Sequence, residues 1–553
     1  MPEEKRKVVK GMAETHKYCI GLDYGTLSAR AILVDVRNGD IVSESIFNYP
    51  HGVMENELTS GVELGENQAL QDPKDYIDAL YTLIPDILKK SDVSPQEVIG
   101  IGVDFTACTV LPIYNDGTPL CFTDEFKNEP NAYVKLWKSH SAQKYATRLN
   151  EILKEKDPKL LKSYGGSISS EWLMPKVLQT IEEAPAVYEK CDKIMEAGDF
   201  ITYILTGNDV RNSCAAGYKG LYGQARGNIS KEVLSLANPL LGNVEKDKLG
   251  KVVPSGSCVG KIKSEIGKKL GLGDNVAVAS AIIDAHAAVP ACGIFDAGKM
   301  LMIMGTSTCH MLLDKKYMEV GGISGSIYNG VIENYYCYEA GQCAVGDVFQ
   351  WVVDNITPAK YFEEAKSRGV DIHTYLSYLS SQKDVGESGI VCLDWLNGNR
   401  SVLMDSTLRG VVKGVSLSTS APDIYRAMIE ATAFGTKKII ENYEESGVAV
   451  KELYACGGIA AKNPVLMQIY ADIIGIEIKV ISVSQTVALG SAIFGAYAAG
   501  SERGGYDTLE EAGEKMSAKV SVVYRPIKKN NVKYDRLYAE YMKLHDFFGK
   551  HKA

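Results

Sequence analysis

Residues 18–36 read YCIGLDYGTLSARAILVDV, two apolar and β-branched runs that meet at the tight turn Gly25-Thr26. Such runs around a short turn predict two neighbouring strands. The pattern continues with a strand predicted at 40–47, a helix at 72–91 and a strand at 98–106. The resulting order, βββαβ, indicates a mixed-sheet α/β protein and not a plain dinucleotide-binding unit.

The segment 299–316, KMLMIMGTSTCHMLLDKK, repeats this opening as strand, Gly-Thr turn, strand and acidic end. Asp35 follows Thr26 by nine residues, and Asp314 follows Thr306 by eight. An internal repeat of this kind predicts duplicated domains that face each other. We therefore expect a charged leader at 1–16, an N-terminal domain at 17–270 and a C-terminal domain at 271–553.

Length and composition agree with two domains and exclude several functions. A chain of 553 residues is too long for one hydrophobic core. The net charge of −9 argues against a nucleic-acid or anionic-membrane partner. The 12 cysteines include no C-x-x-C pair, which excludes common zinc sites and favours a reducing compartment. The leader lacks the apolar stretch of a signal peptide, and Asp284, His286 and Pro290 interrupt the longest apolar region, so we expect a cytoplasmic protein.

Two Gly-Thr turns are candidate phosphate sites. Around Gly25-Thr26, glycine and small hydroxyl residues let backbone N–H groups approach phosphate oxygens. Asp23, at the end of the preceding strand, is placed to hold Mg²⁺ through water. A plain hairpin turn explains the same residues, and no P-loop motif occurs. Residues 305–308, GTST, are a Ser/Thr-rich turn when taken alone, but paired with the first turn they predict a second phosphate clamp.

Two further segments carry candidate residues at the start of a helix. Gly457-Gly458 follows an apolar strand and precedes a helix, which leaves room for a flat adenine and offers N-terminal donors; a helix entry with two glycines is the alternative. Asp284 enters an alanine-rich helix, where the dipole would keep a catalytic base ionised. Taken alone, an N-cap aspartate is the simpler interpretation. We interpret His286 as a histidine that is packed in the interior or supports a ligating residue, and not as a ligand itself.

Some residues are informative only in combination. Lys219 is an isolated cation in a glycine-rich stretch, and Glu339 precedes Gly346 and Gln350. For Trp137 we favour core packing.

Together, the Asp-x-Gly-Thr turn, the Gly-Thr-Ser-Thr turn, the Gly-Gly helix entry and the chain length resemble the FGGY carbohydrate kinases, relatives of actin and hexokinase. The resemblance runs from about residue 18 to 545. Three longer stretches resemble the ribulokinases of that family: 102–112 (GVDFTACTVLP), 130–143 (PNAYVKLWKSHSAQ) and 169–179 (SSEWLMPKVLQ). The resemblance implies two actin-like, ribonuclease H-like α/β domains, with the βββαβ core duplicated and a cleft between them.

The resemblance also implies an activity and residue roles. The activity would be ATP-dependent phosphorylation of the ketopentose L-ribulose to L-ribulose 5-phosphate, as in arabinose catabolism. The catalytic base would be Asp284, and Asp23 would orient Mg²⁺. The residues implied in nucleotide binding are Thr26, Gly305, Thr306, Gly346, Gln350, Gly457, Gly458 and Asn463, although the loop before Asn463 differs by one residue from some relatives. The residues implied in sugar binding are Ala107, Lys219, Asp284 and Glu339.

Two alternatives stay open. One is an FGGY kinase for another ketose or polyol, such as xylulose, D-ribulose or ribitol. The other is a non-catalytic, actin-like nucleotide switch, which would have no need of Lys219 and Glu339 around a second small ligand. The oligomeric state is also open, with a homodimer as one arrangement.

Overall fold

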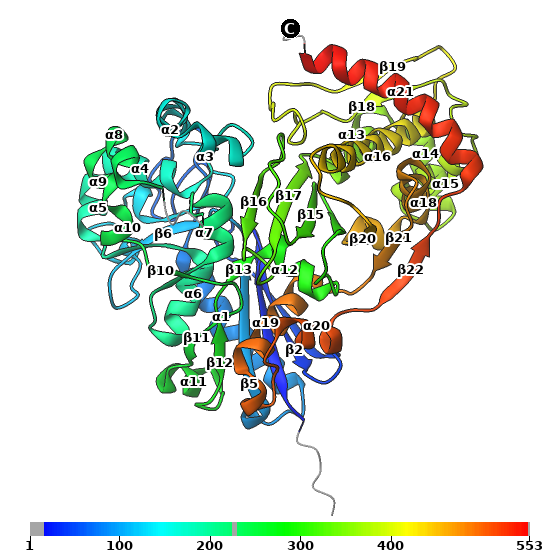
Figure 1. Cartoon of the computed structure of the whole chain (residues 1–553). Helices are drawn as coiled ribbons and strands as arrows, with labels where there is room; N and C mark the ends of the chain where they lie inside the picture. The colour runs from blue at the N-terminus through cyan, green and yellow to red at the C-terminus, as the bar shows by residue number, and fades with distance from the viewer. Residues whose placement is uncertain (1–15, 224–228, 551–553) are drawn as a thin grey trace, which may run out of the picture.

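The computed structural model describes residues 16–223 and 229–550, so the predicted leader lies outside them except for His16. Two mixed sheets of seven strands each form the centres of two domains (Figure 1). The predicted βββαβ opening is confirmed. Its elements are β1 (Tyr18–Tyr24), β2 (Ser28–Asp35), β3 (Ile41–Asn48), α1 (Pro73–Lys90) and β5 (Val98–Phe105).

The second sheet repeats the strand order of the first. In the first sheet, β3, β2 and β1 are antiparallel neighbours, and β1 continues in parallel to β5. In the second sheet, β17, β15 and β14 take the same places, with a parallel step to β20. The second-sheet strands are β14 (Lys299–Met304), β15 (Thr308–Asp314), β16 (Gly325–Tyr328), β17 (Tyr336–Gln342), β20 (Glu452–Cys456), β21 (Ile478–Ile481) and β22 (Val520–Tyr524).

Side-chain alternation gives each sheet an outer and an inner face. On β1, Ile20 and Leu22 pack outward against α1 and α6 (Ala197–Thr206), so Gly21 and Asp23 face inward. On β17, Tyr338 packs outward against α16 (Ala421–Glu445), which leaves Glu339 on the inner face. The carboxylates of Asp23 and Glu339 therefore point toward the region between the two sheets.

Two helices fill this region, α12 (Asp284–Ala291) and α19 (Thr486–Ala499) (Figure 1). Glycines let α19 approach the first sheet at backbone distance. A Cβ atom on Gly102 would lie 1.8 Å from the carbonyl oxygen of Ser491, and one on Gly21 would lie 1.9 Å from that of Ala488. Helix α19 comes from the C-terminal part of the chain, yet it is packed closely on the N-terminal sheet.

The change from one sheet to the other follows residue 283, later than the predicted boundary near 270. Two strands beyond 270 still belong to the first sheet, β12 (Ala277–Ala279) and β13 (Ile282–Ile283), and β12 also pairs with β11 (Cys258–Lys261). Strands β12 and β13 both pair in parallel with β5. The chain then crosses between the sheets at 292–298, returns before α19 and crosses again between α20 (Leu509–Met516) and β22.

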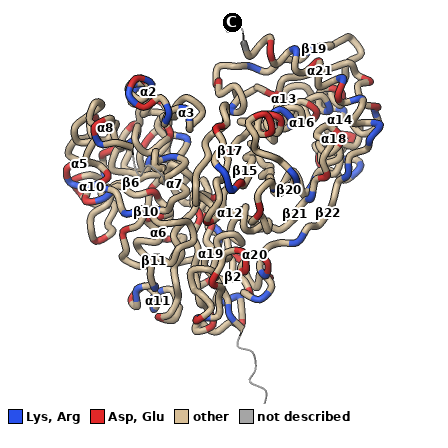
Figure 2. Tube along the Cα trace, viewed as in Figure 1, with Lys and Arg blue, Asp and Glu red and all other residues tan. Residues whose placement is uncertain are grey.

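A helical lobe is added to the first domain around a four-stranded sheet. The strands of this small sheet are β4 (Leu70–Gln71), β6 (Val110–Ile113), β7 (Val134–Lys135) and β8 (Lys193–Glu196). Helices of the lobe include α2 (Gln143–Lys156), α4 (Leu173–Glu183), α7 (Ser213–Lys219) and α10 (Val244–Asp247). Charged residues of both signs occur on outer helices such as α2 and α10, whereas the central strands are mostly uncharged (Figure 2). Within 16–223 and 229–550, no helix is both long and apolar enough to cross a membrane.

Candidate active site

Three carboxyl groups gather where β1, β5 and β13 end. Asp23 and Asp104 are direct partners in the parallel β1–β5 pairing, and Ile282 beside Asp104 leads into Asp284. Asp104 is fully buried, and its Oδ2 atom accepts a hydrogen bond of 2.6 Å from Ser491. Burial, together with the charge of Asp23, raises the pKa of Asp104 well above its ordinary value. The surroundings of Asp104 therefore favour the neutral form of its carboxyl group.

Asp23 is the member of the group with a cationic partner. Its Oδ2 atom lies 3.2 Å from Nη1 of Arg30, on the neighbouring strand. Burial raises the pKa of Asp23, and Arg30 opposes that effect. Arg30 had no role in the sequence interpretation, because the Asp23↔Arg30 pairing appears only when β1 and β2 are in register.

Asp284 is the first residue of α12 and is partly exposed. The N-cap position belongs to Ile283, and no side chain caps the helix. The N-cap interpretation of Asp284 is therefore wrong. Its Oδ1 atom instead accepts a hydrogen bond of 2.6 Å from the backbone N–H of Ala285. Burial, with smaller effects from Asp23 and Glu339, raises the pKa of Asp284 to about 7.

Glu339 joins the two domains through Lys219. Nζ of Lys219, at the end of α7, lies 3.4 Å from Oε1 of Glu339 on β17. Nε2 of His286 lies 3.2 Å from Oε2, without the alignment of a good hydrogen bond. Burial alone would raise the pKa of the Glu339 carboxyl, but Lys219, His286 and Arg400 outweigh it and hold that pKa well below its ordinary value. The carboxylate is thus ionised and electrostatically fixed.

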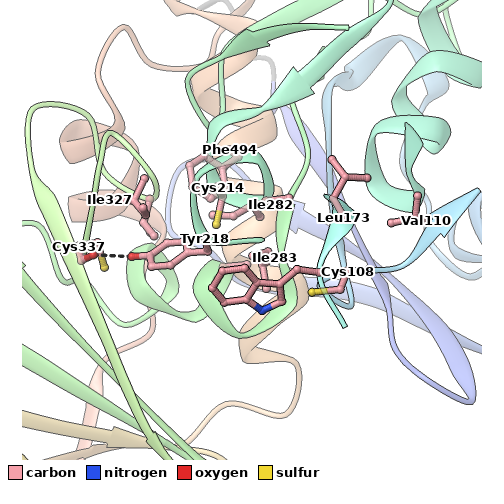
Figure 3. Close-up of a cluster of buried hydrophobic side chains, with 14 of the residues drawn as sticks. Cys108, Val110, Leu173, Cys214, Tyr218, Ile282, Ile283, Ile327, Cys337 and Phe494 are labelled. Atoms are coloured by element: carbon pink, nitrogen blue, oxygen red, sulfur yellow. Dashed lines mark hydrogen bonds between the residues drawn. The ribbon is translucent and has the colours of Figure 1, made fainter. Parts of the chain in front are cut away.

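An aromatic residue packs behind this ion pair. Tyr218 is fully buried and donates a 2.5 Å hydrogen bond to the carbonyl oxygen of Cys337, beside Ile327 (Figure 3). Its ring centroid lies 4.6 Å from that of His286. His286 is only 2% exposed, which confirms the prediction of a packed histidine. Lys219 also lies 5.7 Å from the centre of the Trp172 ring.

The second Gly-Thr turn, the start of α13 (Gly346–Ile356) and the Gly-Gly segment are brought together. The N–H of Gly346 donates to the carbonyl oxygen of Gly305 at 3.1 Å, and the N–H of Val345 donates to the carbonyl oxygen of Thr306 at 2.8 Å. A Cβ atom on Gly457 would lie 2.3 Å from the carbonyl oxygen of Met304, and its φ of +97° suits glycine. Gly458 is exposed and has open space beside it.

Gln350 and Asn463 both contact α15 (Ile372–Ser381), and their side chains already have protein partners. The Gln350 amide donates to Asp354 at 2.8 Å, and its oxygen lies 3.1 Å from His373. The Asn463 amide donates to Ser377 at 2.9 Å, and its oxygen caps α18 (Pro464–Ile474). Both residues thus hold protein structure in this conformation.

The first Gly-Thr turn has an unexpected partner. Nε1 of Trp137 donates to Oγ1 of Thr26 at 3.1 Å, and Nε2 of Gln71 donates to the Thr26 carbonyl oxygen at 2.6 Å. Trp137 is 37% exposed, so our preference for core packing was wrong. The indole N–H reaches the turn because the small four-stranded sheet places the 130–143 stretch beside it.

Other functional candidates were missed in the sequence. Arg400 is an exposed residue whose guanidinium lies close to Gly341, where a Cβ atom would be 3.5 Å from Nη1. Gly341 and Glu339 share the inner face of β17, so Arg400 belongs to the same site. No local sequence pattern marks Arg400. Asp104, in contrast, could have been noticed in the sequence as a carboxylate at a strand end within 102–112.

The carboxylates do not form a closed metal site. In the part of the chain that the structure describes, no group of three His, Cys, Asp or Glu side chains is arranged to hold a metal ion. Mg²⁺ in nucleotide sites usually keeps several waters and one or two carboxylates, with phosphates completing the shell. Asp23, with the buried Oδ1 atom of Asp104 behind it, which has no hydrogen-bond partner among the described residues, fits that partial type of site.

Comparison with known proteins gives matches along almost the whole chain. The model of the N-terminal domain of the FGGY family of carbohydrate kinases matches residues 18–290, and that of the C-terminal domain matches 300–499. A ribulokinase of Bacillus licheniformis is 49% identical over 526 residues, 95% of each chain. A ribulokinase of Halalkalibacterium halodurans is 47% identical over 538 residues, 97% of this chain and 96% of the relative. A xylulose kinase from Rhodospirillum rubrum has the same fold, with a TM-score of 0.80, 20% identity, and coverage of 97% of this chain and 100% of the other.

Proposed function

The chain belongs to the FGGY family of carbohydrate kinases, and from this premise we propose that it transfers the γ-phosphoryl group of ATP to L-ribulose, giving L-ribulose 5-phosphate. The observation that carries the proposal is the Lys219–Glu339 ion pair, which spans the two domains beside Asp284. A nucleotide switch has no use for a buried charge pair next to a candidate base. The choice of sugar is supported by the two ribulokinases at 47–49% identity.

Sugar recognition is assigned to charged groups with fixed orientation. Lys219 supplies N–H donors and Glu339 supplies carboxylate oxygens, and both are suited to hydroxyl groups. Ala107 lies in the turn after β5, and the charge of Lys219 acts on the neighbouring Cys108 thiol, so this turn closes the same site. A buried polar site built for particular hydroxyls discriminates strongly, because a sugar lacking one of them leaves the partner unpaired.

Asp284 is assigned the role of base for the sugar's terminal hydroxyl. With a pKa of about 7, this carboxyl is mostly ionised slightly above neutral pH and binds a proton well as the hydroxyl attacks. The fixed Ala285 N–H leaves one carboxylate oxygen free to face the sugar. Phosphoryl transfer depends mainly on positioning and charge neutralisation, so orienting the attacking oxygen is the larger part of this role.

The phosphates are assigned to the two Gly-Thr turns. Thr26 belongs to the first domain and Gly305-Thr306 to the second, so a nucleotide held by both would lie between the sheets. Asp23 would hold Mg²⁺ through water, and the bound ion would neutralise phosphate charge. Adenosine is assigned to the segments of Gly346 and of Gly457-Gly458, where Gly458 has open space beside it, with Gln350 and Asn463 as neighbours that contact α15.

A substrate panel tests the proposal. ADP release should be measured with ATP, Mg²⁺ and each of L-ribulose, D-ribulose, xylulose, ribitol and glycerol, with a no-sugar control. We expect the highest kcat/KM for L-ribulose. A tenfold preference for another ketose or polyol would reject the substrate but keep the kinase, whereas ADP release that no sugar stimulates would reject both.

A further inference from the structure

Lys176 is a buried cation that has not been assigned a role in the proposed site. It is in α4, is 2% exposed, and its Nζ atom donates to three backbone carbonyl oxygens: those of Cys108, Lys135 at 3.2 Å and Leu136 at 2.8 Å. An ammonium group has three N–H donors and no acceptor, so all three are used. Burying a charge this deeply costs free energy without such partners. The positions of the three carbonyl groups in the chain therefore indicate which segments the lysine holds together.

The first acceptor belongs to the proposed sugar-binding turn. Cys108 follows Ala107 between β5 and β6, and its backbone has a φ of +56°, in the left-handed region. For a residue with a side chain this conformation is unfavourable, because the Cβ atom lies close to the following carbonyl oxygen. The Lys176 hydrogen bond to the Cys108 carbonyl oxygen helps to hold the turn in that shape. Leu173, one turn earlier on α4, packs beside Cys108 and Val110 (Figure 3).

The other acceptors belong to the segment that reaches the first phosphate turn. Leu136 directly precedes Trp137, whose indole N–H donates to Oγ1 of Thr26. The one ammonium group therefore connects the Ala107–Cys108 turn with the Leu136–Trp137 segment. These two segments are more than 20 residues apart in the chain. Strands β6 and β7 pair beside them, at Val110 and Lys135, and the Lys176 ammonium group extends this connection to Cys108 and Leu136, between which the described residues show no main-chain hydrogen bond.

We propose that Lys176 is a positioning residue, whose ammonium group fixes the sugar-binding turn at Ala107 relative to the Trp137–Thr26 contact on the phosphate side. This inference rests on the proposed function, because that function assigns Ala107 to the sugar. Without the ammonium group, the Cys108 turn relaxes and the sugar loses its alignment. A displacement of about 1 Å at a reacting centre can cost up to 10²-fold in rate.

The chain offers a matched control in Lys135. Its ammonium group is also buried, at 6% exposure, and donates to Lys176 O at 3.3 Å, Gln179 Oε1 at 3.1 Å and Thr180 Oγ1 at 2.8 Å. All of these acceptors are on α4, and none is in the Ala107 turn or beside Trp137. Replacing Lys135 with methionine therefore removes a comparable buried amine and its own contacts with α4, but keeps the three hydrogen bonds from Lys176 to the two segments.

The experiment compares Lys176→Met, Lys176→Gln and Lys135→Met in steady-state kinetics and thermal unfolding. For Lys176→Met we expect the KM for L-ribulose to rise about tenfold or more, with the KM for ATP within about twofold of wild type. Lys176→Gln should be intermediate, because its amide can donate to two of the three carbonyls. Lys135→Met should lower the melting temperature while the KM for L-ribulose stays within about twofold.

A Lys176→Met enzyme that melts early but keeps its KM for L-ribulose would overturn the proposal, since the lysine would then be only structural. If both Lys176 variants fail to fold, hydrogen–deuterium exchange on the wild-type protein decides. L-Ribulose should then protect amides in both 106–110 and 135–139, and protection of only one segment would overturn the coupling. A wild-type enzyme that phosphorylates no ketopentose would reject the proposed function separately, because that result involves no variant.

Discussion

Replacing Asp284 with asparagine removes the proposed base and keeps the shape of the side chain. The amide can still accept the Ala285 N–H that the carboxylate accepts at 2.6 Å. A positioned general base contributes roughly 10²–10⁴-fold, so kcat should fall by about that factor. The KM for ATP should change little, because the Gly305-Thr306 turn and the Gly457-Gly458 segment do not depend on Asp284.

Stability should change in the opposite direction to activity. Burial raises the Asp284 pKa from 3.8 to about 7, so the folded protein disfavours the ionised form. Each pKa unit corresponds to about 1.4 kcal/mol, which gives an upper limit of about 4 kcal/mol. Because the side chain is partly exposed, solvent screening reduces this to about 1–2 kcal/mol. Asp284→Asn should therefore unfold at a temperature higher by about 1–3 °C at pH 8.

The sign of the pH effect follows from linkage. Between pH 4 and 7 the unfolded Asp284 carboxyl releases its proton before the folded one, so this residue makes the wild-type protein less stable as pH rises. The asparagine variant lacks that dependence, and its advantage should shrink toward pH 4. In the wild-type enzyme, kcat/KM for L-ribulose should fall about tenfold per pH unit below pH 7, as the base becomes protonated.

The assay measures kcat, both KM values and the melting temperature on one preparation of each protein. Asp394→Asn is the matched control, because burial also raises the pKa of Asp394 to about 7, while its contact is with Gln342 at 3.0 Å on the far side of the second sheet. This control should keep kcat within about threefold. An Asp284→Asn enzyme that melts normally and turns over near the wild-type rate would refute the assignment.

Two further predictions concern the nucleotide and the domains. Gly458→Ala adds a methyl group where the structure has open space, so the protein should fold normally while the KM for ATP rises about tenfold and the KM for L-ribulose stays the same. Gly321→Ala is the control, because a methyl group there also meets open space. An unchanged KM for ATP in the Gly458 variant would remove Gly458 from the adenosine site. The two domains should close on L-ribulose plus a non-hydrolysable ATP analogue, through the crossings at 292–298, 482–485 and 517–519. Small-angle scattering should then show a smaller radius of gyration than with either ligand alone. An unchanged scattering profile would count against closure.

The sequence by itself determined the features that depend on neighbouring residues. The alternation of apolar and polar positions around Gly25-Thr26 predicted the first two strands, and the repeat at 299–316 predicted their counterparts β14 and β15. Strand ends could be read in the same way, which is why Asp23 and Asp284 were recognised as candidates. These features follow from local backbone preferences and from the period of two along a strand.

Sheet membership could not be read locally. The predicted boundary near 270 assigned the strands that follow it to the second domain, yet β12 and β13 complete the first sheet by pairing with β5. Which sheet a strand joins depends on a partner distant in the chain. The same holds for α19, whose small residues fit against Gly21 and Gly102 only after both elements have formed.

Only the tertiary structure decided which side chains meet in the site. Lys219 and Glu339 are 120 residues apart, and Trp137 reaches Thr26 across 111 residues. Their patterns were weak in the sequence, so Trp137 was interpreted as core, and Arg30, Asp104, Lys176 and Arg400 had no assigned role. A charged side chain that is removed from water is stable only when partners of opposite charge or hydrogen-bonding groups replace the water. The packing of the two sheets, and not the spacing of residues along the chain, brings those partners together.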